Sequence, residues 1–136
     1  MSHGCGKLQS INLDSCDEVT DAGVTALSHG CGKLQSINLS SCGAVTDAGV
    51  TALSHGCGQL ESINLTMTCV TDAGLKALAA GCGQLQSISV SYCDFVTDAG
   101  ITALTAKCGQ LKSIEYVDCC NVYDNYQLKY GTSGEM

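Results

Sequence analysis

The residues best suited to chemistry are eleven cysteines and three histidines in a chain of 136 residues. Each histidine precedes a cysteine by two positions, giving the pairs His3–Cys5, His29–Cys31 and His55–Cys57. A cysteine and a histidine can act as nucleophile and base, but residues two positions apart on a helix do not face each other. Later units have Ala80 and Ala106 in the place of the histidine, while the cysteine persists. We therefore expect no catalytic pair here.

The cysteines fall into two regularly spaced series. One series lies 26, 26, 25 and 26 residues apart, at Cys5, Cys31, Cys57, Cys82 and Cys108. The other follows at Cys16, Cys42, Cys69, Cys93 and Cys119, with Cys120 left over. No CxxC pair offers the close ligands of a zinc finger, and an odd count without a secretory signal argues against a disulfide framework. We expect reduced, buried thiols that pack as small hydrophobic side chains.

The sequence disfavours most other chemistries as well. No serine lies in a nucleophile elbow and no glycine-rich loop has phosphate-binding spacing, so we expect no enzyme, no cofactor and no metal site. A net charge of −7, with six lysines and no arginine, disfavours a nucleic-acid partner. No apolar run is long enough for a membrane span and no signal peptide is recognisable, which favours a cytoplasmic or nuclear location without a membrane partner.

The cysteines belong to a longer repeated phrase. GCGQLESINL at 56–65 is followed by VTDAGLKAL at 70–78, and both segments recur along the chain. A self-similar period between about 20 and 50 residues is typical of a solenoid, in which small units bury their apolar faces against one another. The sequence therefore predicts a stack of units rather than one irregular domain.

Each unit opens with a short strand. In KLQSINLDSC the apolar Ile11 and Leu13 alternate with the polar Ser10 and Asn12, which predicts one buried and one exposed face. The same pattern recurs at 34–42, 60–69, 85–93 and 111–119.

The segment after each strand changes to helical periodicity. In VTDAGVTALSHG the apolar Val24 and Leu27, with Cys31 beyond, share one helical face. Thr20 is placed to cap the helix by accepting a hydrogen bond from an amide of the first turn, and Asp21 favours the positive helix end. Equivalent Thr–Asp pairs lie at 46–47, 71–72 and 97–98.

Glycine is the expected helix stop. Gly30, Gly56 and Gly81 lie where a left-handed residue would end each helix, and Lys107 takes this place in the last full unit. We expect the array to lose regularity there.

Successive strands must be parallel, because each helix returns the chain to the edge of the sheet where the strand began. Helices are bulkier than strands, so the stack should curve with the sheet inside and the helices outside. One turn is irregular: 65–72 is one residue shorter than 39–47, and either Thr68 or Cys69 fills the cysteine position.

These residues resemble a known family. The pattern LxxIxLxxC, followed by VTDAGLxAL and GC, resembles the cysteine-containing leucine-rich repeat of the F-box/leucine-rich-repeat substrate receptors of SCF-type ubiquitin ligases. The resemblance covers roughly 2–120 and implies an α/β leucine-rich-repeat solenoid, a short curved horseshoe. Two features depart from the family. Glycine replaces the proline that often follows the helix-end cysteine, and no F-box precedes the repeats, so we expect the adaptor-docking part to lie outside this chain.

We expect a single domain over 1–136. It would comprise a partial N-terminal repeat at 1–19, repeats of 25–26 residues over 20–119, and a degenerate C-terminal cap and tail at 120–136. Because the first repeat is partial, the bare ends of the solenoid are candidates for self-association. The tyrosine-rich tail is either a degenerate capping helix or a docking surface, and residues 132–136 are expected to be disordered.

The polar face of the strands is the candidate binding surface. Its candidate contact residues are Asn12, Asp14, Ser36, Asn38, Ser62, Asn64, Thr66, Ser89 and Glu115. Five strands about 4.8 Å apart give this face roughly 400–500 Å², less than the ~800 Å² that a stable partner usually contributes. The inner face alone therefore predicts weak binding.

Two functions remain open. The resemblance implies a non-catalytic protein–protein interaction module, with substrate recognition in an SCF-type ubiquitin ligase as its specific form and a ligase substrate or adaptor as partner. The near-identity of the units favours instead a structural repeat array without a dedicated partner.

Overall fold

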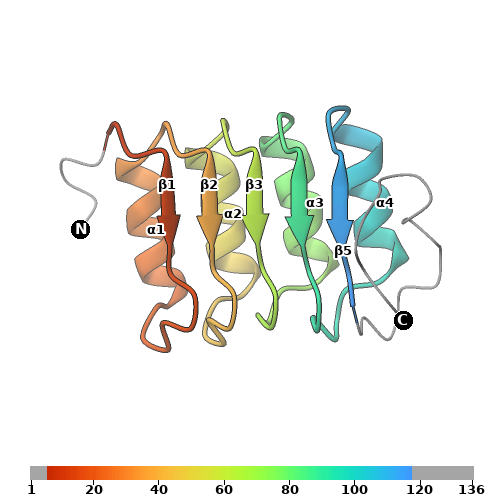
Figure 1. Cartoon of the computed structure of the whole chain (residues 1–136), viewed down its shortest axis with the longest axis horizontal. Helices are drawn as coiled ribbons and strands as arrows, with labels where there is room; N and C mark the ends of the chain where they lie inside the picture. The colour runs from red at the N-terminus through yellow and green to blue at the C-terminus, as the bar shows by residue number, and fades with distance from the viewer. Residues whose placement is uncertain (1–5, 118–136) are drawn as a thin grey trace.

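The computed structural model describes residues 6–117, which form one row of strand–helix units (Figure 1). The strands are β1 (Ser10–Asn12), β2 (Ser36–Asn38), β3 (Ser62–Asn64), β4 (Ser87–Ser89) and β5 (Ser113–Glu115). The helices between them are α1 (Asp21–Gly30), α2 (Asp47–Gly56), α3 (Asp72–Gly81) and α4 (Asp98–Lys107). Every described helix thus follows a strand of the same unit, as the sequence pattern predicts.

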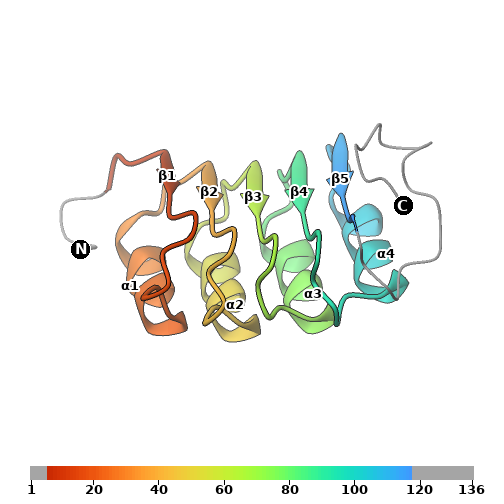
Figure 2. The ribbon, with the colours of Figure 1, turned by 60° about the horizontal axis from the view of Figure 1, so that its bottom comes forward.

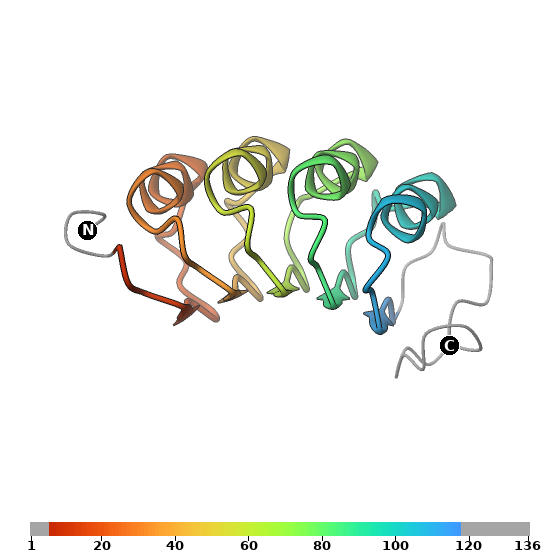
Figure 3. The same cartoon turned by 90° about the horizontal axis from the view of Figure 1, so that it is seen from above.

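The strands form one parallel sheet in chain order, β1-β2-β3-β4-β5. Equivalent residues pair across it, so that Ile11 lies opposite Ile37 and Ile37 opposite Ile63. The helices form a second layer on one side of the sheet and lie farther apart than the strands do (Figures 2 and 3). The stack therefore curves with the sheet on the inside, which confirms the predicted solenoid.

The strands are shorter than the alternating pattern suggests. Each has three residues, and the chain then turns through a residue in the left-handed region: Ser15, Ser41, Met67 and Tyr92 have φ between 60° and 63°. Hydrogen bonds to the next unit nevertheless continue into the turn, where the Ser15 N–H donates to the Ser40 carbonyl at 2.8 Å. The backbone ladder between units therefore extends beyond the strands into the turns.

Equivalent apolar residues stack into columns between the two layers. The column of strand isoleucines is almost fully buried, with Ile37, Ile63 and Ile88 exposed by only 1%, 1% and 2%. Leucines before each strand and on each helix add further columns, among them Leu34, Leu60, Leu85, Leu53, Leu78 and Leu104. In the first unit Ile11 and Leu13 are only partly buried, because within residues 6–117 no unit precedes them.

The helices begin as predicted and end differently. Thr20, Thr46, Thr71 and Thr97 are the N-caps, and each side chain accepts a backbone N–H of the first turn. The expected left-handed glycine stop is wrong: the helices run through Gly30, Gly56 and Gly81, and the following cysteine is the C-cap. Gly56 and Gly81 are required for a different reason, since an added Cβ would overlap the carbonyl oxygens of Ser28 and Ser54 on the preceding helix.

Lys107 occupies the glycine position in α4, which also extends through it. Its C-cap, Cys108, has φ −98° and ψ 84°, whereas the other three C-caps have φ between −124° and −121° and ψ between 60° and 65°. The last described helix thus departs from the geometry of its neighbours where the sequence departs from theirs.

Candidate functional site

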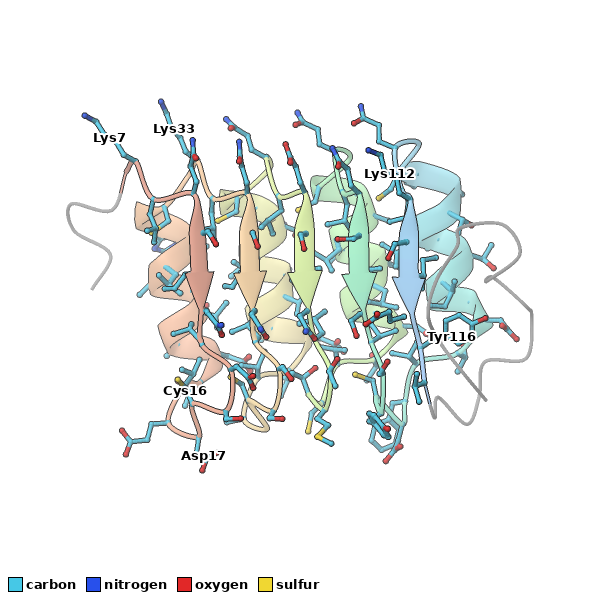
Figure 4. The ribbon with its side chains drawn as sticks, in the orientation of Figure 1. Lys7, Cys16, Asp17, Lys33, Lys112 and Tyr116 are labelled. Atoms are coloured by element: carbon cyan, nitrogen blue, oxygen red, sulfur yellow. The ribbon has the colours of Figure 1, made fainter. Side chains whose placement is uncertain are left out.

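The predicted contact residues lie together on the inner face of the sheet or at the strand ends. Figure 4 looks onto this face, with the helices behind the strands. Asn12 and Asp14 are exposed and Ser89 is buried. The remaining six are half-buried: Ser36, Asn38, Ser62, Asn64, Thr66 and Glu115. The structure thus gathers the nine residues on one surface but leaves Ser89 little contact with solvent.

The asparagine side chains are partly committed to the backbone. The Oδ1 atoms of Asn12, Asn38 and Asn64 each accept the backbone N–H two residues on, at 2.9, 2.9 and 3.0 Å. These contacts hold the chain as it leaves the sheet. The side-chain oxygens are therefore occupied by backbone contacts. The amide NH2 groups of the asparagines remain as hydrogen-bond donors for a ligand.

Hydroxyl groups pair between units at the middle of the face. Ser89 replaces the asparagine in β4, and its Oγ lies 2.7 Å from Thr66 Oγ1. Ser87 donates to Ser62 at 3.1 Å. The centre of the inner surface is therefore uncharged, and part of its hydrogen-bonding capacity is used by contacts between its own hydroxyl groups.

A series of half-buried aspartate carboxylates joins the helices, a contact that the sequence pattern does not reveal. Asp47, in the first turn of α2, accepts the Thr71 N–H at 2.8 Å, the Thr71 hydroxyl at 2.6 Å and the Gly74 N–H at 3.1 Å. Asp21 makes the same three contacts with Thr46 and Gly49 of the next unit. Each aspartate thus caps the helix that follows its own.

Glycine makes room for these carboxylates. A Cβ on Gly49, Gly74 or Gly100 would collide with Oδ1 of Asp21, Asp47 or Asp72, whereas a Cβ on Gly23 would meet nothing within 4 Å. The recurring T-D-A-G phrase therefore encodes a joint between units: threonine and glycine receive the aspartate of the unit before.

The buried cysteines are reduced thiols, as expected, and they also donate hydrogen bonds. The Cys57 thiol donates to the Cys31 carbonyl at 3.3 Å, and the Cys82 thiol donates to the Cys57 carbonyl at 3.5 Å. Burial raises the pKa of Cys57 to about 11 and that of Cys82 to about 12. Burial likewise raises the pKa of Cys42, Cys93 and Cys108. Such thiols are poor nucleophiles near neutral pH.

The irregular turn places Thr68 in the cysteine position. Thr68 is buried and its hydroxyl donates to the Leu65 carbonyl at 2.8 Å, as Cys93 does at 3.0 Å from the next unit. Cys69 is exposed, and its thiol donates to the Gly43 carbonyl at 3.3 Å. The assignment of Cys69 to the second cysteine series is therefore wrong.

The structure reveals exposed residues that the sequence analysis did not single out. Within residues 6–117 the exposed large hydrophobic side chains are Met67, Tyr92 and Phe95. All three lie in the turns that lead from β3 and β4 to the following helices. The signal was present in the sequence, since the matching turn after β2 has the small residues Ser41 and Ala44.

His29 and His55 are exposed on the last turns of their helices, away from the strand face. No group of three or more metal-ligating side chains occurs in the described part of the chain. Between residues 6 and 117, no helix is long and apolar enough to cross a membrane. Cys5, Cys119, Cys120 and the predicted cap and tyrosine-rich tail lie outside the described residues.

Parallel strands on the inside, helices on the outside and contacts repeated from unit to unit define a curved α/β solenoid. A family model described as "Leucine Rich repeat" matches residues 4–28, 30–54, 59–79 and 84–104. The chain therefore belongs to the leucine-rich repeat family. No curated protein matches it in sequence.

Solved structures share the fold at low sequence identity. A chain in the crystal structure of the Rad7 and Elc1 complex in yeast matches with a TM-score of 0.78 and 19% identity, over 93% of this chain and 32% of that chain. This chain thus spans about a third of that relative. The tropomodulin C-terminal domain of Caenorhabditis elegans matches with a TM-score of 0.63 and 11% identity, over 88% of this chain and 75% of that chain. Leiomodin-1 actin-binding site 2 matches with a TM-score of 0.63 and 12% identity, over 88% and 73%.

Proposed function

We propose that the chain is a protein-binding module whose inner strand face contacts a partner protein. The observation that carries this is the gathering of nine polar residues, from Asn12 to Glu115, on one concave surface. Side chains on short parallel strands are held in fixed register, so they present a pre-ordered surface and lose little freedom on binding. Two similar folds, one from the crystal structure of the Rad7 and Elc1 complex and one described as an actin-binding site, support a protein-binding role.

The specific form of this proposal is substrate recognition in an SCF-type ubiquitin ligase. The support is the resemblance of the repeats to the cysteine-containing class, in which buried cysteines recur where Cys42, Cys57, Cys82 and Cys93 stand. In this role the chain would hold the substrate, and a ligase adaptor would be bound through a segment outside the repeats.

The alternative is a structural array without a dedicated partner. It is favoured by the uniformity of the inner face, where Ser36, Ser62, Ser87 and Ser113 repeat one residue at one position. A surface specialised for one asymmetric ligand would be expected to differ from unit to unit.

A pull-down from cell extract with two matched variants separates these functions. Ser62→Arg puts a long cation at the centre of the inner face, and Ala80→Arg puts the same side chain on exposed helix α3. We expect partners to be recovered by the wild type and by Ala80→Arg and lost with Ser62→Arg. Circular dichroism and the urea midpoint verify that both variants fold.

The identity of the recovered proteins tests the finer proposal. Ubiquitin-conjugated proteins among the Ser62-dependent partners would support substrate recognition. Recovery of the bait alone with all three proteins would contradict the binding function and favour the structural array.

A further inference from the structure

Within a nearly uniform array, two neighbouring turns at one edge of the sheet expose large apolar side chains. Met67, Tyr92 and Phe95 are exposed by 51%, 43% and 67%, and they lie in two consecutive turns at the carboxyl ends of the strands. Large side chains of roughly 200 Å² each then expose on the order of 300 Å² together, a size at which apolar patches on soluble proteins are often functional. We refer to these three residues as the turn patch.

The backbone brings the turn patch together across units. The Met67 N–H donates to the Ser91 carbonyl at 3.0 Å, which holds Met67 against the residue that precedes Tyr92. Phe95 pairs with Thr71, four residues after Met67. At the left-handed positions of the turns after β2 and β3, Ser41 Oγ lies 3.5 Å from Met67 Sδ.

The two edges of the sheet differ in charge. The turns after the strands, at 13–20, 39–46, 65–71 and 90–97, hold Asp14, Asp17, Glu18 and Asp94 and no lysine or arginine. The opposite edge carries Lys7, Lys33 and Lys112 and one acidic residue, Glu61, and Figure 4 shows these lysines at one edge and Asp17 at the other. The turn patch therefore lies on an edge that attracts cations and repels anions.

We propose that the turn patch, with Asp94 in one of its own turns and the acidic residues of the turn after β1 farther along the same edge, binds a basic segment of a partner protein that inserts an apolar or aromatic side chain between Lys or Arg residues. The apolar anchor packs on Met67 and Phe95, and Tyr92 offers its ring to an adjacent cation. This inference deepens the proposed function, because it adds a second surface and the chemistry of its ligand. Added to the roughly 400–500 Å² of the inner face, the patch brings the contact area close to the ~800 Å² of a stable partner.

The array supplies its own conservative variants for the test. Met67→Ser and Tyr92→Ser introduce the residue found at Ser41, which has φ 63° in the same turn position, and Phe95→Ala introduces the residue found at Ala44. The triple variant M67S/Y92S/F95A should therefore fold, and the urea midpoint checks this. Ala80→Ser, on the exposed side of helix α3, is the control away from both surfaces.

The probe is a random library of 12-residue peptides displayed on phage and selected on the full chain. We expect selected peptides to carry a Leu, Phe, Met or Trp flanked by Lys or Arg. Synthetic copies should bind the triple variant at least tenfold more weakly and Ala80→Ser within about twofold, and their affinity should fall several-fold between low and high salt. A glutamate-flanked analogue of the best peptide should not bind.

Charge is tested separately with D14S/D17G/E18A/D94G, which copies the uncharged residues of the turn after β2. We expect weaker binding, about three- to tenfold, and a smaller dependence on salt. Equal affinity and salt dependence would contradict the acidic component of the proposal.

Several results would overturn the proposal. These are the absence of any enriched peptide, enrichment of acidic peptides, or equal binding by wild type and triple variant. Self-association in sedimentation velocity that the triple variant abolishes would make a second copy the occupant instead. Displacement of the selected peptides by a synthetic peptide of residues 118–136 would make the occupant a segment of this chain. None of these outcomes depends on Ser62, so failure here and failure of the inner-face function can be told apart.

Discussion

At the scale of single residues, the aspartate at the start of a helix links its own unit to the next one. Asp47 accepts three hydrogen bonds from Thr71 and Gly74, although 24 and 27 residues separate them. Hydrogen bonds to a charged group contribute about 1.5–3 kcal/mol each when their partners are shielded from water, and less when they are not. The aspartate therefore ranks with the buried leucines as a determinant of stability.

We expect Asp47→Ala to lower the free energy of unfolding by about 2 kcal/mol, because it leaves the Thr71 N–H and hydroxyl without their acceptor and leaves the Gly74 N–H with only the Thr71 carbonyl. Asp47→Asn should cost about half as much, since its Oδ1 can still accept. Urea denaturation measures both. Asp17→Ala, which changes an exposed residue in the turn after β1, is the control and should change stability by less than about 0.5 kcal/mol. A similar loss in the control would mean that general charge, not the joint, is responsible.

The buried thiols predict a loss of stability at high pH. An unfolded thiol titrates near its ordinary pKa of 9.0, whereas burial gives folded Cys57 and Cys82 pKa values of about 11 and about 12. Their contribution is fully present below pH 9 and is lost as pH rises toward 12, because the unfolded state releases protons that the folded state retains. The expected slope is at most about 1.4 kcal/mol per pH unit for each such thiol.

Chemical unfolding at pH 8, 9 and 10 measures this slope. Cys57→Ala and Cys82→Ala will each lower stability at pH 8 and should each make the decline above pH 9 shallower. Iodoacetamide labelling at pH 8 should reach the exposed Cys69 well before either buried thiol. A stability that stays constant from pH 8 to 10 would contradict the raised pKa values.

At the scale of helices and strands, the sequence was sufficient for the periodic features. Alternation placed Ile37 and Ile63 in the core, and the Thr20 cap could be read directly because capping acts within one turn. The aspartate joints could not be read in this way, since spacing within a helix does not show which group 25 residues away the carboxylate meets. The left-handed turn at Ser15 also gave no signal, because serine is not a residue that marks such a conformation.

The candidate site was only partly predictable for related reasons. The inner-face position of Asn38 follows from alternation, but the backbone contact that occupies its oxygen depends on the turn. The choice between Thr68 and Cys69 could not be made from residue type, since both side chains are small and both can donate to a carbonyl. The division of the chain into cap, repeats and tail stays a prediction.

Gly23 and Gly74 each end the same phrase, V-T-D-A-G, and together they test how closely the helices approach each other. Gly74→Ala should destabilise the chain by about 1–3 kcal/mol, because its Cβ would displace the Asp47 carboxylate. Gly23→Ala should be neutral or stabilise by up to about 0.5 kcal/mol, since the position is open and alanine favours a helix. Thermal and urea unfolding compare them. Equal effects would show that backbone freedom, not the close approach, explains the glycines.

At the scale of the whole molecule, the array should behave as a one-dimensional stack in which each unit contacts only its neighbours. Deletion of residues 21–46 joins Thr20 to Asp47 and so recreates the Thr–Asp step with the same flanking residues. We expect the shortened protein to fold, with a lower unfolding free energy and a urea m-value reduced by about a fifth, in proportion to the surface lost. A deletion of 21–40, which breaks the period, is the control and should not fold cooperatively.

The joint between Asp47 and Thr71 has a consequence for how such a chain evolves. The aspartate of each joint comes from one repeat, and the threonine and glycine come from the next repeat. Duplication or loss of one whole repeat length therefore leaves a complete joint at the junction, whichever position within the repeat is the breakpoint. Genes of this kind can change length by unequal recombination without inventing a new contact. Selection can then act on the turns after the strands, which already differ in sequence from one unit to the next.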